Sequence, residues 1–62
     1  MRIEDIVEGG VYRGGKDNRP IVRKVSRIAN SVIYTQKGLD GKGSCEVFYL
    51  KWFAMWAKER IA

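Results

Sequence analysis

The chain has 62 residues, of which 12 are Lys or Arg and 7 are Asp or Glu, so its formal net charge is +5. A chain this short forms at most one domain, residues 1–62, with a small core. Because Cys45 is the only cysteine and histidine is absent, the composition excludes an internal disulfide and a Cys/His zinc site. We expect a soluble, cytoplasmic protein, since neither a secretory signal run nor a membrane-spanning apolar stretch is visible and a lone cysteine suits a reducing compartment.

Two glycine pairs divide the N-terminal segment. Ile3, Ile6 and Val7 precede the first pair at residues 9–10, where any helical turn is expected to end. Residues 11–13 then predict a short strand. The second pair and the polar residues 16–18 after it predict a turn or loop.

Residues 20–28, PIVRKVSRI, fit two secondary structures. Ile21, Val25 and Ile28 have helical spacing, and Asn18 is a suitable helix cap. However, the segment is rich in Ile and Val, which favour strands, although the alternation of a strand holds only if a bulge interrupts it. We favour a bulged strand and keep the helix as the alternative.

The next residues predict a hairpin. Residues 29–31 form a turn signal, and residues 31–37 read as a strand. The glycine-rich run 37–43 contains an Asp-Gly pair, a strong hairpin signal, and residues 44–49 return as the second strand. We expect Cys45 to pack there as a small hydrophobic residue.

The tail from residue 50 predicts an amphipathic helix. Its apolar stripe consists of Leu50, Phe53, Ala54, Ala57 and Ile61. On the same helical wheel Trp56 lies beside the stripe and Trp52 lies opposite it. We therefore expect Trp56 to join the core and Trp52 to be exposed.

These elements predict a mainly β (α+β) fold. It is a small bent antiparallel sheet or SH3-like barrel of four or five short strands, closed at one end by one C-terminal α-helix. The opening Ile3, Ile6, Gly9, Tyr12 and Arg13, together with a closing F-A-x-W-A motif at residues 53–57, resembles short uncharacterised proteins encoded by bacteriophages and prophages. That resemblance implies a small-barrel fold and a bacterial host cell, and it brings no catalytic residues.

The residue types needed for catalysis are missing or scattered. No histidine is present to activate a serine or Cys45, and the phosphate-loop pattern fails because Lys16 is followed by Asp17. The carboxylates lie mostly in expected loops or on exposed faces, which is not typical of an acid–base pair or a metal site. We therefore expect no enzyme activity, no catalytic residues, no metal, no cofactor and no small-molecule substrate.

A cluster of positive charge suggests a nucleic-acid-binding surface. Between residues 13 and 27 six cations stand against the single acid Asp17. Such a cluster is also compatible with an ordinary solvated face. The proposed contacts are Arg13, Lys16, Arg19, Arg23, Lys24 and Arg27 for phosphates, and Tyr34 for base stacking. Because no base-reading helix is evident, binding is expected to tolerate sequence and to weaken with salt.

The alternative hypothesis is a protein-interaction module. Exposed tryptophans are frequent in interface hot spots, and Trp52 has Lys51 and Met55 nearby on the expected helix. This helix would bind and modulate a host protein, or it would join two copies of the chain. The two hypotheses are compatible, because they use different surfaces.

Overall fold

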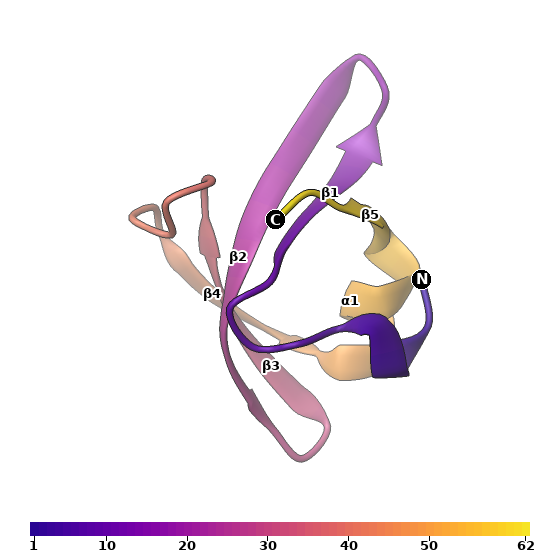
Figure 1. The fold of residues 1–62 in the computed structure, drawn as a ribbon, viewed down its shortest axis with the longest axis vertical. Helices are drawn as coiled ribbons and strands as arrows, with labels where there is room; N and C mark the ends of the chain where they lie inside the picture. The colour runs from indigo at the N-terminus through magenta and orange to yellow at the C-terminus, as the bar shows by residue number, and fades with distance from the viewer.

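The computed structural model describes all residues, 1–62, as one antiparallel sheet with two short helices. The 3-10 helix η1 spans Ile3–Asp5 and the α-helix α1 spans Leu50–Trp56. The five strands are β1 (Val11–Lys16), β2 (Arg19–Ala29), β3 (Val32–Lys37), β4 (Cys45–Tyr49) and β5 (Ala57–Arg60). The predicted mainly β class with a C-terminal helix is confirmed, with five strands in a bent, barrel-like sheet (Figure 1).

The strands lie in the order β4-β3-β2-β1-β5. Short turns join β1 to β2 and β2 to β3, and in the second of these Asn30 adopts a positive φ of 56°, a conformation that asparagine tolerates better than most residues. A glycine-rich loop at residues 38–44 joins β3 to β4. Figure 1 shows these three hairpin ends projecting in three directions, while the N-terminal segment and α1 lie together on the remaining side.

The core lies between the bent sheet and α1. Tyr12, Val25 and Ile33 from three strands are completely buried, and Phe53 of α1 packs edge-on against Tyr12 with ring centroids 5.7 Å apart. The Tyr12 hydroxyl accepts a hydrogen bond from the Val7 N–H (2.8 Å) and donates one to a backbone carbonyl of η1 (3.0 Å). One side chain therefore links the sheet, the helix and the N-terminal segment.

The segment that fitted both a helix and a strand forms β2, and the prediction of a bulged strand is confirmed. The β2–β3 register shifts between Val25 and Arg27, because Val25 pairs with Thr35 and Arg27 pairs with Tyr34. The extra residue is Ser26, whose hydroxyl donates a hydrogen bond to the Tyr34 carbonyl (3.1 Å). A single inserted residue reverses which side chains face the core on either side of it.

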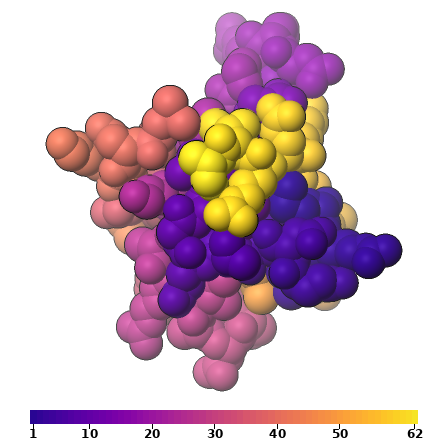
Figure 2. Space-filling model, viewed as in Figure 1, coloured from indigo at the N-terminus to yellow at the C-terminus, as the bar shows by residue number.

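The predicted tail helix is too long. The structure ends α1 at Trp56, and residues 57–60 form β5, which pairs with β1. This pairing provides hydrogen-bond partners for backbone N–H and C=O groups at the edge of β1, which would have no partner strand if the helix continued. The stripe is correct as far as Ala57, which is buried with Phe53 and Ala54, whereas Ile61 is exposed. Figure 2 shows the C-terminal residues, in yellow, packed beside the N-terminal half of the chain.

Two smaller expectations are also wrong. Gly14 and Gly15 continue β1 instead of ending it. Residue 14 is a glycine because Trp56 packs closely on it, and a Cβ there would lie 2.6 Å from the Trp56 carbonyl oxygen. Cys45 is exposed rather than packed as a hydrophobic residue, since it lies on the side of the edge strand β4 that faces away from the core. Neither helix has the length and apolar character needed to cross a bilayer.

Candidate nucleic-acid-binding surface

The predicted basic residues divide between the two faces of the sheet. Paired residues on neighbouring antiparallel strands share a face, so the buried Tyr12 and Val25 identify the inner face. By this register the outer face receives Arg13, Lys24, Arg27 and Tyr34, and the inner face receives Lys16, Arg19 and Arg23.

The bulge at Ser26 determines where Arg27 lies. In an unbroken strand Arg27 would share the inner face with Arg23 and Val25, because side chains two residues apart point the same way. The extra residue instead places Arg27 opposite Tyr34 on the outer face, where its guanidinium lies 5.8 Å from the ring centroid. Arg27 and Lys24 consequently belong to one surface.

The centre of the outer face combines charge, a ring and an amide. Lys24 and Arg27 of β2 pair with Gln36 and Tyr34 of β3, respectively. Directly opposite residues in a sheet lie roughly 5 Å apart and diagonal ones about 7–8 Å. The stem of Lys24 packs against the loop 38–44, because a Cβ at Gly41 would lie 2.9 Å from the Lys24 Cδ. Neither Lys24 nor Arg27 forms an ion pair, so both cations are available to an anionic ligand.

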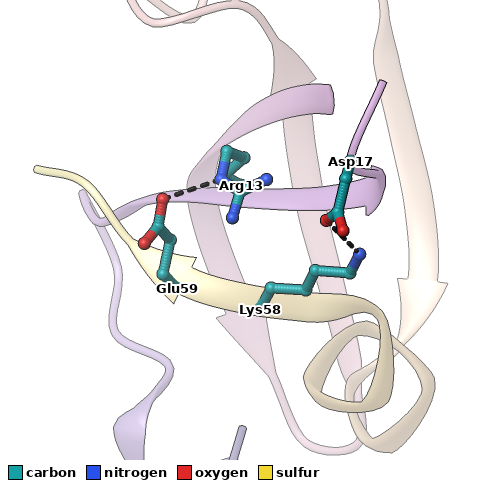
Figure 3. Close-up of polar contacts among 4 residues, drawn as sticks. All are labelled: Arg13, Asp17, Lys58 and Glu59. Carbon is teal, nitrogen blue, oxygen red and sulfur yellow. Dashed lines mark hydrogen bonds and ion pairs between the residues drawn. The ribbon is translucent and has the colours of Figure 1, made fainter. Parts of the chain in front are cut away.

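Arg13 extends this surface towards β5, but unlike Lys24 and Arg27 it forms an ion pair within the protein. Its Nε donates to Glu59 at 2.7 Å, and its two terminal nitrogens are turned away from that carboxylate (Figure 3). A second ion pair, between Lys58 and Asp17 at 3.1 Å, joins β5 to the β1–β2 turn (Figure 3). Both pairs connect β5 to the rest of the sheet, and Arg13 keeps donors for a further acceptor.

Arg23 is placed inside the domain. Only 12% of its side chain is exposed, it donates to Glu46 at 3.0 Å, and its guanidinium lies 5.2 Å from the Phe48 ring centroid. Its Nη1 is buried and has no hydrogen-bond partner. Arg23 is therefore not part of the outer face, which presents the neighbouring Lys24 of the same strand instead.

Lys16 and Arg19 lie at the end of the β1–β2 hairpin, beyond the core. They are opposite each other in the register, both are exposed, and neither forms an ion pair. These two cations form a second positive site that is connected to the outer face through β1 and β2.

The residues of the alternative hypothesis gather on α1. Lys51, Trp52 and Met55 are all exposed on α1, with Trp52 60% and Met55 80% exposed, as predicted. Trp56 is partly buried against the core, also as predicted. The Trp52 ring meets the exposed Tyr49 edge-on at 5.6 Å.

Sequence reasoning missed Gln36 and Tyr49 as members of these surfaces. The alternation of residues 32–37 places Gln36 on the same face as Tyr34, so the pattern of that strand was sufficient to include it. The alternation of residues 45–49 likewise places Tyr49 on the same face as Cys45 and Val47, which the register with β3 makes the outer face.

The chain was compared with protein-family models, with curated proteins and with solved structures, and none of them matches it.

Proposed function

We propose that this protein is a non-catalytic nucleic-acid-binding module whose outer sheet face holds the sugar-phosphate backbone. The observation that carries the proposal is the unpaired cations Lys24 and Arg27 beside the ring of Tyr34. Charged groups next to a flat ring are the combination that single-strand-binding surfaces use. On the resemblance of its opening and closing motifs, the proposed setting is a bacterial cell that carries a phage or prophage.

In the proposed complex each side chain has a separate role. Lys24 and Arg27 bind successive phosphates, and Arg13 contributes the terminal nitrogens that Glu59 leaves free. Tyr34 stacks on an unpaired base, for which its partner Arg27 would have to turn from the ring towards a phosphate. Lys16 and Arg19 lie on the inner side at the tip of the β1–β2 hairpin, so only a longer strand that passes round this tip would reach them.

Binding on this surface is expected to be tolerant of sequence. The only α-helix spans seven residues and buries Phe53 and Ala54, so it offers no polar face for reading bases in the major groove. Three phosphate contacts predict that the logarithm of the binding constant falls with the logarithm of salt concentration with a slope of about −2 for a single strand. Contacts by Lys16 and Arg19 would steepen that slope to about −3.5.

The test is fluorescence anisotropy with labelled single-stranded and duplex oligonucleotides at about 50 and about 200 mM salt. Arg27→Gln is expected to weaken binding several-fold and to make the salt slope for a single strand shallower by about 0.7. Lys51→Gln is the matched control, because it removes the same charge from α1 on the other side of the core. Absence of binding at about 50 mM salt, or an equal loss in both variants, would rule out this surface.

A further inference from the structure

The strand β4 (Cys45–Tyr49) lies at one edge of the sheet, so that one of its sides has no neighbouring strand. The Leu50 N–H donates to the Ser31 carbonyl at 2.7 Å, which shows the register with β3. Since hydrogen-bonded and outward-facing residues alternate along an antiparallel strand, Cys45 and Val47 direct their N–H and C=O groups away from β3. These backbone groups are able to pair with another strand.

The edge of β4 lacks the features that usually block such pairing. Val47 and Tyr49 are 53% and 59% exposed, and no proline interrupts the strand. Its one charged residue, Glu46, points to the inner face, where the ion pair with Arg23 compensates its charge. The opposite edge, β5, carries three consecutive charged residues at 58–60, which is a common protection against edge pairing.

Depressions lie on both sides of this edge. The one on the inner side has a volume of about 180 Å³ and is lined by Arg23, Glu46, Phe48, Trp52, Phe53 and Trp56. The one towards the outer side has a volume of about 360 Å³ and is lined by Val32, Val47, Phe48, Tyr49 and Trp52. The exposed indole of Trp52 borders both depressions. Successive side chains of an added strand point to opposite faces, so one strand can fill both depressions.

The charges around β4 favour an acidic occupant. Lys42 precedes the strand and Lys51 follows it, both are exposed, and neither forms an ion pair. We propose that β4 and Trp52 bind an extended acidic segment of a partner protein, which joins the sheet beside β4 and places alternating apolar side chains in the two depressions. This site does not include Lys24, Arg27 or Tyr34, although its outer depression adjoins that surface at Val47, which pairs with Tyr34. The proposal stands without the nucleic-acid function.

A second copy of the chain fits the edge less well. Two β4 strands paired about a two-fold axis run in opposite directions, so the start of one lies beside the end of the other. That arrangement brings Lys42 of one copy towards Lys51 of the other, between chains that each carry a net charge of +5. Both lysines lie just outside β4, in the loop before it and on α1, and like charges brought close together repel each other.

The test is selection from a displayed library of random peptides on the immobilised full chain, followed by titration of the enriched peptides. The expected result is a set of apolar peptides flanked by Asp or Glu. Their binding should protect the Val47 amide from hydrogen exchange. Val47→Pro removes a donor on the free edge without removing a bond to β3, and it should weaken binding by ~10-fold or more. Trp52→Ala should have a comparable effect.

Two variants serve as controls. Val47→Thr keeps the N–H and the strand preference, and Met55→Ala changes an exposed residue of α1 that lines neither depression, so both should bind the peptides normally. Circular dichroism establishes that each variant is folded. Trp52→Ala should leave oligonucleotide binding unchanged, because Trp52 lies on α1 and not beside Lys24, Arg27 or Tyr34, and this separates the proposal from the proposed function.

Several results would overturn the proposal. No enrichment of peptides is one, and enriched peptides that lack acidic residues are another. Peptides that bind Val47→Pro normally but lose affinity for Arg27→Gln would show that the basic outer face captured them. A concentration-dependent dimer that is abolished by Val47→Pro, without peptide binding, would assign the edge to a second copy.

Discussion

The hydroxyl of Tyr12 offers the sharpest test of how the N-terminal segment is held. Tyr12→Phe keeps the buried ring and its contact with Phe53, and it removes only the oxygen that accepts from Val7 and donates to Asp5. Each such bond contributes about 0.5–1.5 kcal/mol, so the variant should lose about 1–3 kcal/mol. A domain of this length has a free energy of unfolding of only about 3–9 kcal/mol. The loss corresponds to a fall in Tm of about 5–20 °C.

Thermal unfolding by circular dichroism measures the total loss, and native-state hydrogen exchange locates it. The Val7 amide should exchange faster in Tyr12→Phe than in the original protein, because its acceptor is gone. Tyr49→Phe is the matched control, since that hydroxyl lies on an exposed ring without a side-chain hydrogen bond, and it should change stability by less than about 0.5 kcal/mol. If the two variants melt alike, or if Val7 exchanges at its original rate, the Tyr12 hydroxyl does not anchor the segment.

Three further predictions concern packing and exposure. Gly14→Ala should cost about 1–3 kcal/mol in a thermal melt, because its methyl group would overlap Trp56, and an unchanged Tm would contradict that contact. Cys45 should react with a thiol reagent in the folded protein about as fast as in denaturant, whereas marked protection would show that it is covered. Acrylamide should strongly quench the fluorescence of Trp52, and the Trp52→Phe variant should retain only the weakly quenched emission of Trp56. Equal quenching of the original protein and the variant would argue against an exposed Trp52 indole.

Local sequence patterns were sufficient for much of the fold. The β-branched content of residues 20–28 outweighed their helical spacing, and the broken alternation near Val25 correctly indicated a bulge. The turn signals at residues 29–31 and 37–43 correctly separated the strands. The stripe of Phe53, Ala54 and Ala57 correctly identified the buried side of the tail, and Trp52 correctly lay opposite it. These features follow from side-chain direction and turn chemistry within a few residues, which the sequence alone contains.

The end of α1 was not predictable in that way. Residues 57–61 have the composition and spacing of a helix, but β1 presents an open edge to them, and pairing with it replaces the helical hydrogen bonds. The exposure of Cys45 has a similar cause, because it depends on the pairing of β4 with β3, which turns Cys45 to the face away from the core. Both outcomes depend on which strand lies next to which.

The composition of the candidate site shows the same division. The sequence by itself determined that six cations gather between residues 13 and 27 in a β-rich chain. Only the tertiary structure decided that Arg23 is held by Glu46 beneath the sheet, while the bulge brings Arg27 round to join Lys24 on the opposite face. The physical reason is that one inserted residue reverses side-chain direction, and the face that becomes the core depends on where α1 packs.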